Sequence, residues 1–180
     1  MEEMYLNLQI VRTLVFIAIL VLVSVTMISC TSRNMRPAVA LNYLAQQIEN
    51  GELNDIELTI YYISISMLVR FPISADSLLE LHDEKIVISS EELGKHIDLP
   101  QILTSFALVP ARQSSMVDAR IYYVFSRNGD VILDVVMWGN RNTNVFVNGR
   151  EFEWNDVFID VIEPFLPEEK VARLRVYVGG

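Results

Sequence analysis

The feature that most constrains this chain is an uncharged apolar run near its N-terminus. Residues 13–32 read TLVFIAILVLVSVTMISCTS, with Arg12 before the run and Arg33 after it. A helix of about 20 residues rises about 30 Å, which matches the hydrocarbon core of a bilayer. Such a run is hard to bury in the core of a small soluble domain. We therefore expect residues 1–30 to be a signal peptide or a membrane anchor.

The end of the run carries the only cysteine of the chain, Cys30. The segment Met27-Ile28-Ser29-Cys30 resembles the lipobox of bacterial lipoprotein signal peptides, and polar residues follow it. The resemblance implies cleavage before Cys30 and lipidation of its sulfur. Membrane lipid is then the partner of the anchor, and the domain lies outside the cell membrane. A lipobox, a short linker at 31–37 and one compact domain together resemble the organisation of small lipoproteins of Gram-positive bacteria.

Two other interpretations of the run stay open. An uncleaved transmembrane helix over 13–32 has sufficient length, but the positive-inside rule does not orient it. Arg12 and the amino terminus lie on one side of the run, and Arg33 and Arg36 lie on the other. Alternatively, Cys30 is a small residue in or beside a core helix, because cysteine is among the most often buried residue types.

The composition of the remaining chain predicts one globular domain over 38–180. From Pro37 onward the sequence has 21 acidic and 11 basic side chains, a net charge of −10. Such a domain repels phosphate backbones, so we expect no nucleic acid partner. A single cysteine permits no internal disulfide, and a domain of this length needs none to bury a core.

The segment 118–154 predicts an antiparallel meander. Apolar stretches at 119–126, 131–138, 144–147 and 150–154 are joined at Asn128-Gly129 and Asn148-Gly149. Asn-Gly accepts the positive φ angles of a type I′ hairpin turn. Further strands are expected at 55–64 and 85–88, and a loop with one helical turn at 74–81. Helices are expected at 38–50, 89–106 and 157–166. Gly51 is a natural C-cap for the first of them, and Ser89 with Glu92 has capping-box spacing at the start of the second. The second helix should break near Pro100, and another helix should start at 167. The predicted class is α+β, an antiparallel sheet covered by helices on one face, behind an N-terminal apolar helix.

The residues that carry chemistry form no recognisable catalytic pattern. His82 and His96 lack the converging ligands of a metal site, and Ser114-Ser115 lacks a glycine elbow. We expect no metal and no cofactor. Asp134 lies within an apolar strand, so it is the acid whose pKa burial could raise. Alternation would place it beside Ile132, Val136 and Trp138, with Arg120 or Tyr123 as partners across the hairpin.

Three functions are compatible with these patterns. The leading hypothesis is a membrane-anchored, extracytoplasmic binding module, more plausibly not an enzyme. An exposed aromatic patch on the meander would support it. The aromatic residues are Tyr122, Tyr123, Phe125, Trp138, Phe146, Phe152 and Trp154. The alternatives are an envelope hydrolase that uses carboxylates such as Asp134 and Glu153, and a single-span membrane protein with a regulatory soluble domain.

Overall fold

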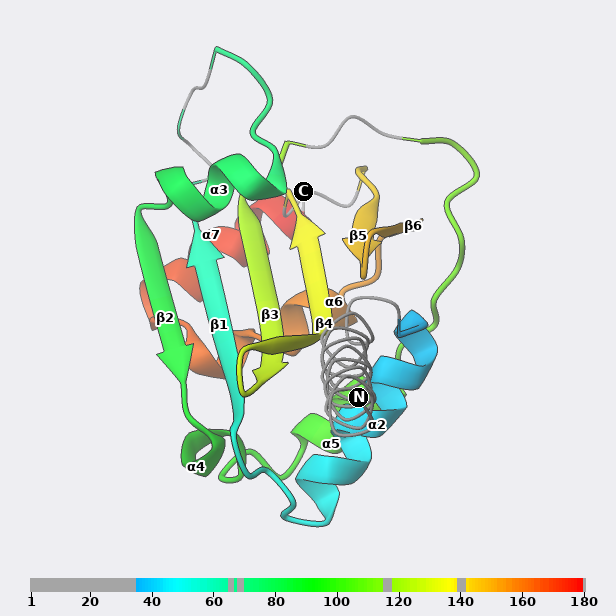
Figure 1. Cartoon of the computed structure of the whole chain (residues 1–180). Helices are drawn as coiled ribbons and strands as arrows, with labels where there is room; N and C mark the ends of the chain where they lie inside the picture. Colours follow the sequence, from blue (N-terminus) through cyan, green and yellow to red (C-terminus); the bar gives the residue numbers. More distant parts are fainter. Residues whose placement is uncertain (1–34, 65–66, 68–69, 115–117, 139–141, 180) are drawn as a thin grey trace, which may run out of the picture.

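A six-stranded antiparallel sheet forms the centre of the protein in the computed structural model (Figure 1). The structure describes residues 35–64, 67, 70–114, 118–138 and 142–179. The strands are β1 (Ile56–Tyr62), β2 (Glu84–Ile88), β3 (Ile121–Arg127), β4 (Asp130–Met137), β5 (Val145–Val147) and β6 (Arg150–Phe152). Their order is β2-β1-β3-β4-β5-β6. The α+β class and the meander from β3 to β6 are as expected from the sequence.

The helices lie mainly on one side of this sheet. They are α2 (Pro37–Glu49), α3 (Ala75–Leu81), α4 (Ser90–Leu93), α5 (Leu99–Thr104), α6 (Val157–Asp160), the 3₁₀ turn η2 (Glu163–Phe165) and α7 (Glu168–Gly179). Figure 1 shows α6 and α7 behind the sheet and α3 across its opposite face. The helix expected over 157–166 is thus two short pieces, and the segment after 167 is helical.

Two clusters of buried side chains occupy the two faces. The larger cluster joins β1, β3 and β4 to α2, α5 and α6, and includes Leu58, Tyr123, Leu133 and Phe158. The smaller cluster lies under α3 and is built from Ile63, Ile73, Leu78, Ala119, Tyr122 and Val136. Helical cover on a single face was therefore too simple an expectation. Residues 74–81, expected to form a loop with one helical turn, form α3, whose Leu78 closes the second cluster.

Local signals set the turns and helix starts as the sequence predicts. Asn128 and Asn148 have φ angles of 52° and 47°, and the glycines after them have 84° and 70°. The hydroxyl of Ser89 accepts a hydrogen bond from the amide of Glu92 at 3.3 Å, which starts α4. The break expected near Pro100 lies at residues 94–98, which separate α4 from α5.

The strand β4 contains an irregularity that alternation did not predict. The register with β3 shifts between Phe125 and Ser126, so that Phe125 pairs with Leu133 and Ser126 with Val131. Ile132 is the extra residue, and its side chain joins the larger cluster with Leu133. The expectation that Ile132 shares a face with Asp134 is wrong for this reason.

Candidate functional site

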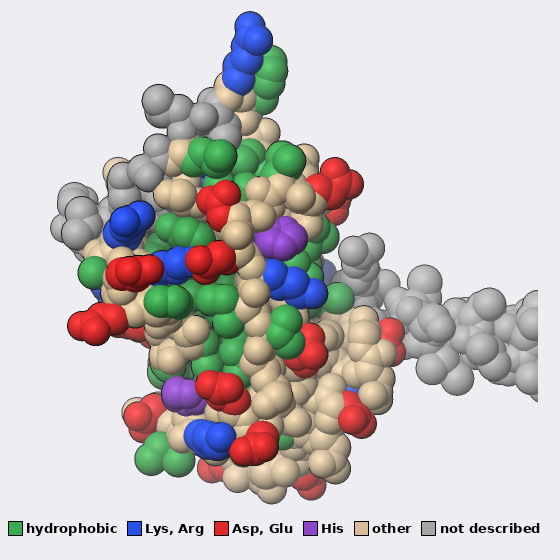
Figure 2. All heavy atoms as spheres, turned by 90° about the vertical axis from the view of Figure 1, so that its left-hand side faces the viewer, with side chains coloured by type: hydrophobic (Ala, Val, Ile, Leu, Met, Phe, Trp, Pro, Cys, Tyr) green, Lys and Arg blue, Asp and Glu red, His purple; other side chains and the backbone are tan. Residues whose placement is uncertain are grey.

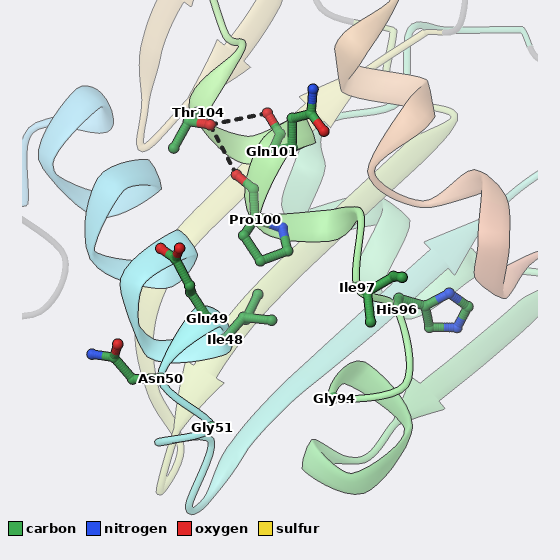
Figure 3. A pocket seen from close by; sticks show the side chains of 10 residues that line it. All are labelled: Ile48, Glu49, Asn50, Gly51, Gly94, His96, Ile97, Pro100, Gln101 and Thr104. Atoms are coloured by element: carbon green, nitrogen blue, oxygen red, sulfur yellow. Dashed lines mark hydrogen bonds between the residues drawn. The ribbon is translucent and has the colours of Figure 1, made fainter.

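The largest hollow that we describe lies at the junction of α2 with the α4–α5 connection (Figure 3). Its volume is about 690 Å³, within the range of ligand sites. Its lining comes from two segments far apart in sequence: Ile48, Glu49, Asn50, Gly51, Gly94, His96, Ile97, Pro100, Gln101 and Thr104. We call this surface the α2–α5 hollow.

The end of α2 shapes one wall of the α2–α5 hollow. Gly51 has a φ of 72°, which glycine adopts without steric cost. The amide of Gly51 donates to the carbonyl of Ile48 at 3.1 Å, and the amide of Glu52 donates to the carbonyl of Gln47 at 2.8 Å. This pair of bonds is a Schellman ending, which satisfies the last carbonyls of the helix. The sequence predicted Gly51 as a C-cap, but not the hollow beside it.

The opposite wall is the start of α5. Pro100 lies in its first turn, where a missing amide proton costs nothing. The hydroxyl of Thr104 lies 3.0 Å from each of the carbonyls of Pro100 and Gln101, so its hydrogen bonds stay within the helix. Figure 3 shows both contacts. This wall therefore presents a methyl group and a proline ring rather than free hydroxyl donors.

The α2–α5 hollow contains few side chains that can exchange a proton. Glu49 and His96 are the only titratable side chains among its lining residues. The His96 ring packs edge-on against Phe165, with centroids 4.5 Å apart, and Figure 3 shows it turned away from α2. Thr104 carries the only hydroxyl among the lining residues, and its hydrogen bonds go to carbonyls of its own helix.

A second hollow of about 370 Å³ continues along the same two helices. It shares Thr104 with the first and is otherwise lined by Ala38, Leu41, Asn42, Leu103, Phe106 and Leu108. Apolar side chains dominate this lining. The two hollows thus meet at Thr104, beside the packing seam of α2 and α5.

A different hollow of about 250 Å³ separates α7 from the β1–β2 end of the sheet and is strongly charged. Lys170 forms an ion pair with Glu84 and lies 5.1 Å from the ring centroid of Tyr62. Burial lowers the pKa of the Lys170 ammonium; Asp83 opposes this shift and Arg173 adds to it. No sequence pattern singled out Lys170 as a functional residue. Its contacts attach α7 to β1 and β2, as those of Arg175 with Asp160 and Glu163 attach it to α6 and η2.

A buried arginine lies at the start of β3. Arg120 is 4% exposed, and its Nη2 donates to Oδ2 of Asp118 at 3.0 Å. Within the described part of the chain its Nε and Nη1 have no partner. The nearby hollow lined by Asp118 and Trp138 is about 10 Å³, room for one water molecule. This cluster has a structural role, since Oδ1 of Asp118 also receives the amide of Ile73 at 2.9 Å.

The predicted carboxylates are not brought together. Asp134 pairs with Val124 in the β3–β4 register, not with Arg120 or Tyr123 as expected. Glu153 follows β6 and lies 3.5 Å from Nε of Arg112. Neither acid lines any of the four hollows described here. Asp134 and Glu153 therefore share none of these hollows as a carboxylate pair.

The two histidines, for which no metal role was expected, make packing contacts, and so do the meander aromatics. The His82 ring lies edge-on to Tyr61 at 5.2 Å, and its Nδ1 is 3.0 Å from the carbonyl of Leu79. In the described ranges, no three His, Cys, Asp or Glu side chains gather as metal ligands. None of the seven meander aromatics is exposed, so the aromatic patch that would have supported ligand binding is not present there.

The lipidation site predicted at Cys30, the apolar run at 13–32 and Ser115 lie outside the described residues. Within those that are described, every helix is too short or too polar to cross a bilayer. Comparisons with protein-family models, with curated proteins and with solved structures gave no match.

Proposed function

We propose that this protein is a membrane-held binding module, and that the α2–α5 hollow is where its partner docks. The observation that carries this proposal is the combination of a wide hollow with a lining that has no reactive pair. A partner held there would contact side chains from α2, α5 and the connection before α5.

The anchor is the sequence-derived part of the proposal. The apolar run ends at Ser32, and α2 begins five residues later at Pro37. The side-chain amide of Asn148 donates to the carbonyl of Met35 at 3.0 Å, which ties the chain before α2 to the β5–β6 turn. So short a tether would hold the domain close to the bilayer. We propose that Cys30 is lipidated and that the domain is extracytoplasmic.

The anchor is tested by metabolic labelling with radioactive palmitate in a bacterial host. The wild-type chain should incorporate label, and Cys30→Ala should not. Equal labelling of the two chains would eliminate lipidation at Cys30. Membrane retention of an unlabelled chain would instead support the spanning helix.

The docking surface is tested by site-specific photo-crosslinking in the cells that make the protein. A benzophenone amino acid at Gln101, in the hollow, should give a discrete adduct. The same probe at the exposed Asp76 of α3 should not, because α3 lies on the other face of the sheet. Adding Ile97→Asp to the Gln101 probe should abolish the adduct. No adduct from Gln101, or one indifferent to Ile97→Asp, would refute the docking function.

A further inference from the structure

We propose that the α2–α5 hollow takes a basic polypeptide segment that carries an aliphatic side chain. This inference rests on the proposed docking function and specifies the chemistry of the partner. It is argued from the charge around the hollow and from the apolar groups inside it.

The two segments that form the hollow have fewer basic side chains than the rest of the domain, so their 40 residues carry a net charge of −5, half of the −10 carried from Pro37 onward. Residues 37–55 and 89–109 carry six carboxylates and one lysine. The six acids are Glu49, Glu52, Asp55, Glu91, Glu92 and Asp98, and all are exposed. Glu49 lines the hollow itself, and the other five lie on the segments outside its lining. One cation from outside these segments, Arg127, donates to the backbone carbonyl of Glu52 at 3.2 Å. The lysine, Lys95, is paired with Glu91 at 3.1 Å. Figure 2 shows acidic side chains outnumbering basic ones at the lower end of this view, over α4.

This charge selects the sign of the partner. Carboxylates near a hollow attract a cationic partner and raise its association rate, and they repel phosphate and acidic peptides. The acids are exposed, so the attraction must weaken as salt screens it. A segment with several lysines or arginines complements this surface, whereas a nucleic acid does not.

The hollow also offers an apolar contact. Ile97 is 85% exposed, the highest value among the large hydrophobic side chains described as exposed. It stands across from Ile48 of α2 and near Pro100 (Figure 3). An isoleucine so open to water gains from burial against an aliphatic partner. In the neighbouring hollow Leu41 and Leu103 are buried, and the half-buried Phe106 and Leu108 supply the apolar contact.

The experiment measures fluorescence anisotropy of a defined peptide with the full-length chain in a nonionic detergent at low ionic strength. The probe is fluorescein-Gly-Gly-Lys-Lys-Leu-Lys-Lys-Leu-Gly. Two comparison peptides replace every Lys by Glu, or every Leu by Ser. The proposal expects saturable binding of the first peptide, weakened by salt, and weaker binding of the other two.

Matched variants localise the binding. Glu49→Lys with Asp98→Lys should weaken it at least about tenfold, whereas Asp76→Lys with Glu80→Lys, on α3, should change it less than about twofold. Both pairs alter net charge equally, and all four positions are exposed. Ile97→Ser should weaken binding about threefold or more, while Val87→Ser on β2 should not. Unchanged circular dichroism establishes that each variant is folded.

Three results would overturn this inference. Equal loss from both lysine pairs would show attraction to net charge alone. No binding of the Lys-Leu peptide, or preference for its Glu counterpart, would exclude a basic partner. In the last two cases a Gln101 adduct that Ile97→Asp abolishes would leave the docking function standing, so the two failures are distinguishable.

Discussion

The two faces of the sheet are covered in very different ways. Tyr122 and Tyr123, which are neighbours in β3, lie on opposite faces and show the difference. Tyr123 of β3 is fully buried under the helices of the larger cluster, and its hydroxyl has no partner among the described residues. Tyr122, next to it, faces the smaller cluster and stacks on Tyr61 with centroids 5.8 Å apart. The larger cluster joins α2, α4, α5, α6 and α7 to the sheet, whereas the smaller is closed by α3. Stability should therefore depend mainly on the first face.

The largest expected effect tests this dependence on core packing. Leu133→Ala, in β4 under the helices, should lower the free energy of unfolding by about 3–5 kcal/mol. Leu78→Ala, in α3, should cost about 2–3 kcal/mol, because a short helix shifts more easily into the space left. Both leucines are fully buried, so the comparison isolates the surroundings. Urea unfolding followed by circular dichroism measures both values. A loss for Leu78→Ala equal to that for Leu133→Ala would contradict the asymmetry.

A smaller effect concerns Tyr123, whose burial raises the pKa of the phenol well above its ordinary value of 10.0. Above about pH 10 the unfolded chain releases this proton and the folded chain keeps it, so the free energy of unfolding falls as pH rises. Tyr123→Phe should remove this part of the alkaline loss. It should also stabilise the protein by about 1–2 kcal/mol at pH 7, since an unpartnered buried hydroxyl disappears.

Tyr122→Phe is the control for that measurement, because Tyr122 lies on the other face. Denaturation curves between pH 7 and pH 11 should separate the two variants. An alkaline loss of the same size in wild type and Tyr123→Phe would rule out Tyr123 as its source.

The smallest effect distinguishes α3 from the main core. The hydroxyl of Ser74 accepts a hydrogen bond from the amide of Ser77 at 3.0 Å and caps α3. Ser74→Ala should cost about 0.5–1 kcal/mol. Hydrogen exchange should accelerate in α3 while β3 and β4 keep their protection. Uniform acceleration across the sheet would mean that α3 does not open independently of the rest.

Much of the fold was predictable because its signals are local. The two Asn-Gly pairs predicted hairpins. Each of these residues has a positive φ, and this turn geometry does not depend on where the hairpin lies in the sheet. Ser89 and Glu92 predicted the start of α4, and Pro100 predicted a break. The predictions were wrong for residues whose contacts come from distant parts of the sequence. Ile132 follows a shifted register with β3, and the residues of α3 form a helix that packs on β1 and β3.

The candidate site was less predictable than the fold. The hollow joins the end of α2 to residues 94–104, which lie more than forty positions further along the chain. The acidic bias of both segments and the isolated Ile97 were visible in the sequence. Their proximity was not, since it depends on how α2 and α5 pack together over the sheet.

The sequence by itself determined the acidity of the domain, its hairpins and helix caps, and the apolar run that predicts an anchor at 13–32. These follow from composition and from bonds between residues a few positions apart. Tertiary structure alone decided that β1 lies between β2 and β3, that the meander aromatics are buried or half-buried, and that the hollow lies at the α2–α5 seam. The physical reason is that strand order and burial depend on the total apolar surface that the whole chain removes from water. A pattern of a few neighbouring residues does not determine that total.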